Sequence, residues 1–223
     1  MKLLASLVLA TPLLTTTTFA EPYWVAWEGD DGLLPEQAGW VRHWGDRDGE
    51  FHGDGATRTL EAGILTYDDR ADPWIYDISL REGMGNIDPD PGEVFVMEWR
   101  LKVEDVGAPW VGSIGLFSDD SWGLGLNFAE GHIVSSFEGL LELPIVPAVY
   151  HRYRVTSSDM RTYVLAVDNV VIHEGHFVQV LSESRVAWGS GSSGATASGL
   201  MYWDYFRYGV VPEPSALVLL LMA

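Results

Sequence analysis

Apolar and polar residues alternate with a period of two along much of this chain, and this pattern restricts the fold more than any other feature. The stretch VFVMEWRLKV (Val94–Val103) has apolar residues at positions 95, 97, 99, 101 and 103 and charged residues at 98, 100 and 102. WGLGLNF (Trp122–Phe128) alternates in the same way. Successive residues of a strand point to opposite faces, so each stretch predicts an antiparallel strand with one buried face.

Residues typical of turns separate further β-rich stretches at intervals of about 8–12 residues. The remaining predicted strands are Gly63–Tyr67, Trp74–Leu80, Val111–Phe117, His132–Phe137, Tyr150–Thr156, Thr162–Val167, Val170–Glu174, Ser184–Trp188 and Leu200–Val210. Asp168 and Asn169 tolerate positive φ, so they predict a tight hairpin turn between two of these strands. With no convincing amphipathic helix between the termini, the pattern predicts an all-β antiparallel β-sandwich over residues 21–210.

The charge and the cysteine content exclude several classes of protein. The formal net charge of −19 disfavours nucleic acid and anionic membrane surfaces as partners and suits divalent cations or a neutral polysaccharide. The chain contains no cysteine, which excludes disulfides, thiolate zinc sites and cysteine nucleophiles. We therefore expect the core alone to hold the fold.

The first twenty residues, Met1–Ala20, have the features of a secretory signal peptide. Lys2 precedes an apolar stretch that is shorter than the ~20 residues of a membrane-spanning helix, and Thr18-Phe19-Ala20 provides small residues for cleavage. We expect a signal helix that is cleaved after Ala20. A buried first helix and a retained membrane anchor are the alternatives.

The C-terminal half resembles the concanavalin A-like lectin/glucanase superfamily, which includes laminin-G-like modules. Three short motifs support the resemblance: Tyr153-Arg154-Val155, Val167-Asp168-Asn169 and Asp204-Tyr205-Phe206-Arg207. The resemblance implies a jelly-roll sandwich in which the last strand lies beside the first. That fold carries lectins, hydrolases, lyases and adhesion modules, so it does not specify an activity.

Residues 211–223 resemble the start of a PEP-CTERM sorting signal, in which Pro212, Glu213 and Pro214 would be the sorting motif. The resemblance implies an exported protein of a Gram-negative bacterium and processing by an exosortase-type protease. The spanning helix and the arginine-rich tail of that signal are absent here, because only eight apolar residues, Ala216–Ala223, follow. We therefore interpret the segment as truncated, with no stable membrane span, and expect an extracellular or cell-envelope location.

No catalytic motif is recognisable in the sequence. The Glu-x-Asp-x-x-Glu string of the glucanase branch is absent, and Glu98 shares a predicted outer face with Arg100 and Lys102, where we expect it to be solvated. The run Gly189–Gly194 does not fit a serine-hydrolase elbow. HEGH (His173–His176) lacks the zinc-helix spacing and is interpreted as a pair of partly exposed loop histidines.

Acidic loops are the candidate metal sites, because Ca²⁺ prefers several oxygen ligands. Asp46 and Asp48 lie in one glycine-rich loop, and Asp88 and Asp90 lie in another. The resemblance adds a third pair, in which Glu28 of the first strand meets Asp204 of the last near a structural ion. Ordinary turn chemistry and backbone capping are the alternatives for all six acids.

Ten tryptophans are many for 223 residues. Sugar rings stack on aromatic planes, so six tryptophans, several of them flanked by Gly, Pro or acidic residues in turns, are the candidate ligand-binding residues. These are Trp24, Trp27, Trp40, Trp44, Trp74 and Trp110. Trp99, Trp122 and Trp188 lie in alternating strands and are expected in the core; core packing is also the alternative for the loop tryptophans.

Together these features favour a non-catalytic exported protein that binds extracellular polysaccharide through an aromatic and acidic rim, with Ca²⁺ as a candidate cofactor. Two alternatives stay open. One is a glucanase-like hydrolase or polysaccharide lyase with an unrecognised active site, and the other is a structural surface-layer or matrix protein with no soluble ligand.

Overall fold

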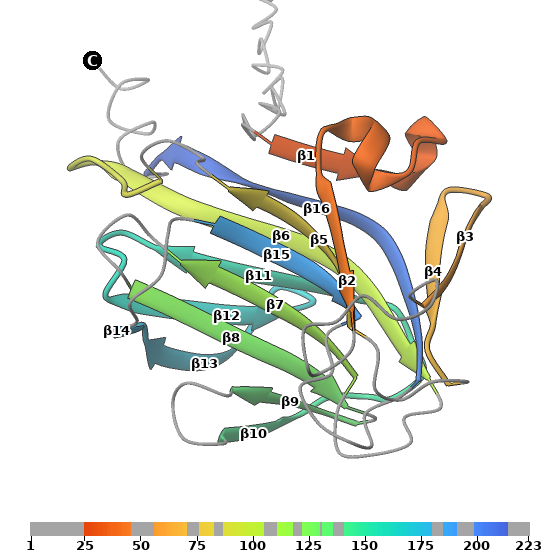
Figure 1. The fold of residues 1–223 in the computed structure, drawn as a ribbon. Coiled ribbons are helices and arrows are strands. Elements are labelled where there is room, and N and C mark those ends of the chain that lie inside the picture. The colour runs from red at the N-terminus through yellow and green to blue at the C-terminus, as the bar shows by residue number, and fades with distance from the viewer. Residues whose placement is uncertain are drawn as a thin grey trace, which may run out of the picture.

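The computed structural model describes residues 25–45, 56–70, 76–82, 87–104, 111–117, 122–129, 131–135, 141–179, 185–190 and 199–213. These residues form two antiparallel sheets stacked face to face (Figure 1). The predicted all-β antiparallel β-sandwich is therefore confirmed. The predicted signal helix, residues 1–20, lies outside the described residues.

The sheet that we name sheet A contains eight strands. Its main order is β13 (Val170–His176), β12 (Thr162–Val167), β11 (His151–Ser157), β6 (Glu93–Glu104), β16 (Leu200–Pro212), β4 (Ile64–Asp68) and β3 (Thr57–Glu61), and β1 (Val25–Glu28) also pairs with β16. Every pairing is antiparallel. The resemblance implied that the last strand lies beside the first, and the pairing of β1 with β16 agrees.

The second sheet, sheet B, also contains eight strands. Its main order is β10 (Leu141–Pro144), β9 (His132–Ser135), β8 (Trp122–Ala129), β7 (Val111–Phe117), β15 (Arg185–Ser190), β5 (Tyr76–Glu82) and β2 (Val41–Gly45), and the short β14 (Val178–Gln179) pairs with β8. Two 3₁₀ turns, η1 (Gly29–Asp31) and η2 (Pro35–Ala38), connect β1 to β2. Within the described ranges, no helix is long and apolar enough to cross a membrane.

Aromatic rings fill the space between the sheets. Trp188 of β15 stacks on Phe206 of β16 with ring centroids 5.3 Å apart and an interplanar angle of 8°. Trp99 of β6 stacks on Tyr153 of β11 at 5.4 Å. The expectation that Trp99 and Trp188 belong to the core is confirmed, since both are fully buried, whereas Trp122 is only partly buried against the core.

A bulge in β16 sets which residues of this strand face outward. The register with β6 shifts between Trp203 and Tyr205, so Trp203 and Phe206 both face the core. Asp204 and Tyr205 are left on the outer side. This is how one strand provides core aromatics and polar surface residues at neighbouring positions.

Every strand predicted from the sequence corresponds to an observed strand, and Asp168 and Asn169 have φ values of 50° and 67°, as the predicted hairpin requires. The prediction missed β1, β2, β3, β10 and β14. Three of these, β2, β3 and β10, are edge strands, where a mostly exposed sequence such as TRTLE (Thr57–Glu61) carries little apolar signal. At the other end, β16 extends to Pro212, two residues beyond the predicted end of the domain.

Gly29, at the start of η1, packs against the backbone of the β3–β4 turn. A Cβ atom placed on Gly29 would lie 1.7 Å from the carbonyl oxygen of Gly63 and 2.9 Å from that of Asp204. Both contacts are with backbone, which cannot rotate away. Only glycine fits here without a backbone shift.

We therefore expect Gly29→Ala to lower the free energy of unfolding by about 3 kcal/mol, at the upper end of overpacking costs. Urea unfolding of the full chain measures this. The control is Gly32→Ala, where φ is 68° but no atom lies within 4 Å of the added methyl group, so strain alone should cost about 1 kcal/mol. Equal stability of the two variants would contradict the proposed close contact.

Candidate functional site

Four charged residues form a cluster on the outer face of sheet A, on the three strands β11, β6 and β16. Arg154, Glu98 and Arg207 are directly opposite one another in register, so their side chains share one face. Arg152, two residues before Arg154, reaches diagonally into the same row. We call Arg152, Arg154, Arg207 and Glu98 the arginine cluster.

Glu98 has no exposed surface, because the arginine side chains cover it. Its Oε1 accepts hydrogen bonds from Nη2 of Arg207 at 2.6 Å and from the hydroxyl of Tyr205 at 3.0 Å. Its Oε2 accepts from Nε of Arg152 at 3.0 Å and lies 3.4 Å from Nε of Arg154. The prediction of a solvated Glu98 was wrong: the strand pattern placed it on the outer face, but pattern alone does not show that neighbouring strands bring arginines over it.

Tyrosines and further cations continue this face beyond the arginine cluster. Arg100 pairs with Asp204 at 2.5 Å and lies over the ring of Tyr150, with its guanidinium carbon 4.6 Å from the centroid. Nζ of Lys102 lies 4.0 Å from the ring centroid of Tyr202. Such cation–π contacts hold the cations and the partly exposed rings in fixed relative positions.

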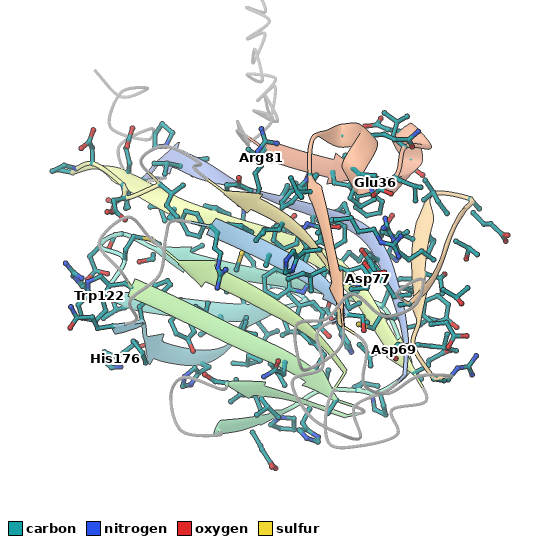
Figure 2. All side chains as sticks on the ribbon, in the orientation of Figure 1. Glu36, Asp69, Asp77, Arg81, Trp122 and His176 are labelled. Atoms are coloured by element: carbon teal, nitrogen blue, oxygen red, sulfur yellow. The ribbon has the colours of Figure 1, made fainter. Side chains whose placement is uncertain are left out.

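A pocket of about 540 Å³ opens on the same face, where β11 and β13 end and β12 begins. We call it the edge pocket, and the residues used below are Thr156, Thr162, Val164, Glu174 and His176. In register, Thr156 lies opposite Val164, which lies opposite Glu174, and Thr162 lies opposite His176. Alternation on three neighbouring strands therefore gathers hydroxyl, carboxylate and imidazole groups at one place. Figure 2 labels His176 on β13, one of the two edge strands of sheet A.

The turn between β11 and β12 positions Thr162 at the pocket. The carboxylate of Asp159 accepts hydrogen bonds of 2.8 Å from the backbone N–H groups of Arg161 and Thr162. Burial raises the pKa of Asp159, but these N–H groups and the Thr162 hydroxyl together hold it below its usual value of 3.8. The charged form of Asp159 therefore stabilises this turn.

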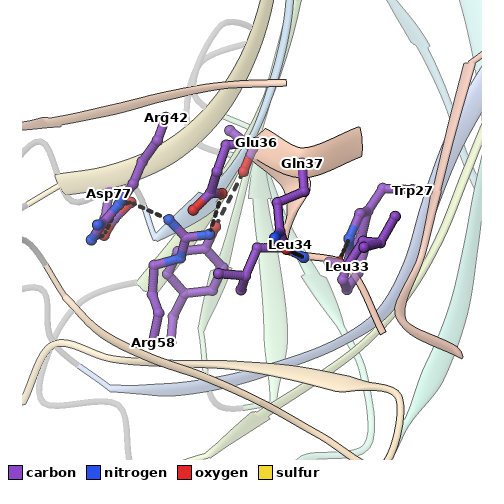
Figure 3. A network of polar contacts seen from close by, with 10 residues as sticks. Trp27, Leu33, Leu34, Glu36, Gln37, Arg42, Arg58 and Asp77 are labelled. Atoms are coloured by element: carbon purple, nitrogen blue, oxygen red, sulfur yellow. Dashed lines mark hydrogen bonds and ion pairs between the residues drawn. The ribbon is translucent and has the colours of Figure 1, made fainter. Parts of the chain in front are cut away.

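A second polar network lies between the edges of the two sheets (Figure 3). The fully buried Asp77 of β5 accepts from Nε of Arg42 at 3.0 Å, and Nη1 of Arg58 lies 4.0 Å away. Nη2 of Arg58 donates to Glu36 of η2 at 2.8 Å, and the guanidinium lies 5.3 Å from the ring centroid of Tyr67. Burial raises the pKa of Asp77, which Arg42 partly offsets. The network joins β2, β3, β5 and η2, which indicates a structural role.

Asp69 makes a similar connection at the end of β4. It accepts hydrogen bonds from the hydroxyl of Ser190 and, at 2.6 Å, from the backbone N–H of Gly199. Burial raises the pKa of Asp69. Its partners belong to β15 and to the residue before β16, so this carboxyl also links the two sheets.

The structure brings together one of the predicted metal-binding pairs. Glu28 is opposite Tyr205, next to Asp204, and its pKa is raised by burial and by the nearby acids, with Arg207 opposing. However, Arg207 lies 3.8 Å from Glu28, and Arg100 pairs with Asp204, so both carboxylates already have a cationic partner.

The other two predicted metal-binding pairs are not shown to form a site. Asp88 and Asp90 lie before β6, with Asp90 exposed, and Asp46 and Asp48 lie outside the described residues. Across the described ranges, no group of three or more histidine and acidic side chains is placed to hold a metal ion.

The predicted tryptophan rim is corrected at two positions. Trp27 and Trp40 are only 1% and 2% exposed and pack against Trp188, so they belong to the core and cannot stack on a sugar. The backbone of Trp44 forms part of β2, but its side chain is not described. Trp24, Trp74 and Trp110 lie outside the described residues.

The sequence prediction also misplaced the histidines and missed the arginines. His173 and His176 lie within β13 and not in a loop. For the arginine cluster a signal was present: Arg152 and Arg154 alternate with buried residues of β11 in a chain that has only thirteen basic residues. The edge pocket gave no such signal, because it depends on the register of three strands.

Comparisons with known proteins identify the fold alone. No family model matches the chain, and no curated protein matches it significantly. Among solved structures, the carbohydrate esterase vb_24B_21 from Shiga toxin-encoding bacteriophage phi24B is similar over 87% of this chain and 100% of its own, with a TM-score of 0.62 and 9% identity.

Two further solved structures have the same fold. Domain 4 of AbnA, an extracellular GH43 arabinanase from Geobacillus stearothermophilus in complex with arabinotriose, matches over 87% of this chain and 96% of its own, with a TM-score of 0.56 and 11% identity. A structure of botulinum neurotoxin type C, whose cell entry depends on interaction with two ganglioside molecules, matches over 89% of this chain and 50% of its own, with a TM-score of 0.53 and 9% identity. The fold is thus an antiparallel β-sandwich that these proteins share.

We expect Asp77→Asn to lower the free energy of unfolding by about 3 kcal/mol, because the substitution removes the charge of a fully buried carboxylate that pairs with Arg42 and lies 4.0 Å from Arg58. Urea unfolding measures the loss. Asp68→Asn is the matched control: it breaks an exposed pair with Arg70 and should cost less than about 1 kcal/mol. Similar losses in both variants would contradict the structural role of the buried network.

Asp159 predicts a pH dependence of stability. Because its folded-state pKa lies below 3.8, its stabilisation is fully present above that pH and is lost as the pH falls through the folded-state pKa. Asp159→Asn should therefore be less stable than the wild type at about pH 6, and the gap should shrink between about pH 4 and pH 2. Urea unfolding across this range measures the gap, and a gap independent of pH would contradict the assignment.

Proposed function

We propose that this chain is an exported, non-catalytic protein that binds extracellular polysaccharide through the outer face of sheet A. The edge pocket is the observation that carries the proposal. Its volume of about 540 Å³ lies within the range of small-molecule sites, and its hydroxyl, carboxylate and imidazole groups match the donors and acceptors of sugar hydroxyls. The partly exposed tyrosines beside the arginine cluster offer apolar planes to further sugar rings.

The related folds support this proposal by analogy. Domain 4 of the arabinanase was solved in complex with arabinotriose, so a sandwich of this shape carries a sugar in that protein. Cell entry of the neurotoxin, of which this chain matches 50%, depends on interaction with two ganglioside molecules. At 9–11% identity the analogy concerns the fold, and the site argument depends on the residues of this chain. The predicted signal peptide at Met1–Ala20 and the sorting motif around Glu213 support export.

The carboxylates of this face favour binding over hydrolysis. Glycoside hydrolysis needs two carboxyl groups across a cleft, one of them free to exchange a proton. Glu98 and Asp204 are occupied by arginines, and Glu104 pairs with Lys102 at 2.7 Å. In the edge pocket Glu174 is the single carboxylate among the described lining residues.

Binding by the full chain to a panel of immobilised polysaccharides tests the proposal. Glu174→Gln and His176→Gln should each weaken binding about tenfold, because each removes a hydrogen bond of a charged or polar group to the sugar. Glu142→Gln and His132→Gln are the matched controls, since both lie in sheet B, on β10 and β9, and they should bind as the wild type does.

Two outcomes would contradict the proposal. Absence of binding to every polymer would favour a structural matrix protein. Release of new reducing ends or of acyl groups from a bound polymer, lost in Glu174→Gln or His176→Gln, would instead favour a hydrolase at the edge pocket.

A further inference from the structure

The imidazole of His151, at the start of β11, lies between two hydrogen-bond acceptors. Nδ1 is 2.6 Å from a carboxylate oxygen of Asp168 in the β12–β13 turn, and Nε2 is 2.8 Å from the carbonyl oxygen of Val146. Both nitrogens are therefore within hydrogen-bond distance of an oxygen. The His151 side chain is only 9% exposed, so water competes little for either nitrogen.

Two acceptors around one ring require a proton on each ring nitrogen. A carbonyl oxygen only accepts, so Nε2 has to donate to Val146. Burial raises the pKa of Asp168, but the backbone N–H of Arg152 and the ring of His151 together hold it below its usual value of 3.8. Asp168 is therefore a carboxylate above about pH 4, and Nδ1 has to donate as well. The geometry thus corresponds to an imidazolium.

Charged and titratable groups of several elements surround this pair. They are Arg152 and Tyr153 of β11, Arg100 of β6, and Tyr150 before β11. The two arginines pair with Glu98 and Asp204 on the outer face of sheet A. Burial raises the pKa of both tyrosine hydroxyls, which therefore stay neutral. On β6 the residue directly opposite His151 is the apolar Leu101. Among these groups, Asp168 is the acid that faces the ring.

The bond to Val146 ties the chain segment that crosses from sheet B to sheet A. We call residues 145–150, between β10 and β11, the crossover segment. At its start, the Ile145 N–H donates to the carbonyl oxygen of Gly131 at 2.8 Å. Val146 and Val149 are 60% and 44% exposed, so packing of these two side chains holds the segment only weakly. The hydrogen bond from His151 therefore helps to fix its position.

We propose that His151 is a pH-sensitive clamp on the crossover segment, closed while the imidazolium donates to both Asp168 and Val146 and open once Nε2 has lost its proton to water. A neutral ring has a single N–H for two acceptors. The charge-assisted bond to the carboxylate is the stronger one, so Nδ1 keeps its proton. The lone pair of Nε2 then faces the Val146 carbonyl oxygen, and the two repel each other. The clamp is therefore closed at the acid end of the imidazole range and opens as the pH rises.

The clamp is coupled to the outer face of sheet A through Tyr150, the last residue of the crossover segment. The guanidinium carbon of Arg100 lies 4.6 Å from the centroid of the Tyr150 ring. An open clamp loosens the backbone that carries this ring, so its contact with Arg100 should weaken. The inference concerns His151 itself and does not depend on polysaccharide binding.

NMR titration of the full chain, with isotope-labelled histidine and valine, tests the clamp between about pH 5 and pH 9. The His151 ring should carry a proton on both nitrogens at the acid end and lose the proton on Nε2 as the pH rises. The carbonyl signal of Val146 should change with the same midpoint, because its hydrogen bond is lost in that step.

Two variants supply the second test. Asp168→Asn removes the charge that favours the imidazolium and keeps a residue that tolerates the positive φ of the turn, so it should move the midpoint of the Val146 signal to lower pH by about 1 pH unit. His151→Gln should abolish the titration of the Val146 carbonyl. His132→Gln on β9 is the matched control, because it removes a histidine elsewhere and should leave that titration unchanged.

The outcomes are distinct. Coincident titration that disappears in His151→Gln and moves to lower pH in Asp168→Asn supports the clamp. A Val146 signal that stays constant while the His151 ring titrates overturns it, and so does a ring that loses the proton on Nδ1 first. Thermal unfolding shows whether each variant is folded, and the wild-type titration decides if one is not. No polysaccharide is present in these measurements, so the result is independent of the proposed function.

Discussion

Burial of aromatic rings between the two sheets is the interaction on which the rest of this structure depends. The chain has no cysteine, so no disulfide can join the sheets. The stack of Trp188 of sheet B on Phe206 of sheet A, with centroids 5.3 Å apart, lies at the centre of that contact. Rings of this size each remove a large apolar area from water, which supplies the main driving force for a sandwich without cross-links.

Buried charges add a second, more specific connection at the edges of the sandwich. Asp77 with Arg42 and Asp69 with Ser190 each join segments that are distant in sequence. Buried ion pairs contribute little net stability, but loss of one partner is costly. These networks therefore fix the position of the edges of the two sheets relative to each other, while the aromatic core supplies most of the free energy of folding.

The sequence was sufficient to predict the fold and some of the residues on the outer face of sheet A. It was not sufficient to predict the arginine cluster or the edge pocket. Alternation in Val94–Val103 correctly separated the buried Trp99 from the outward Glu98. It could not show that Glu98 is buried by arginines of β11 and β16, because cross-strand neighbours depend on register. Trp27 and Trp40 were misassigned for a related reason. Trp27 lies in the four-residue β1 and Trp40 just before β2, where too few residues alternate to indicate a buried face, yet both rings pack against Trp188.

The strict alternation of β11 and β6 limits the conformational entropy that the protein would lose when a ligand binds. Arg154 and Glu98 occupy outward positions directly between inward, fully packed neighbours such as Tyr153 and Trp99. The backbone beneath the arginine cluster therefore cannot shift without disturbing the core, and Glu98 restricts the rotamers of the guanidinium groups. A ligand that bound this face would find its partners already ordered, so association would cost the protein little conformational entropy.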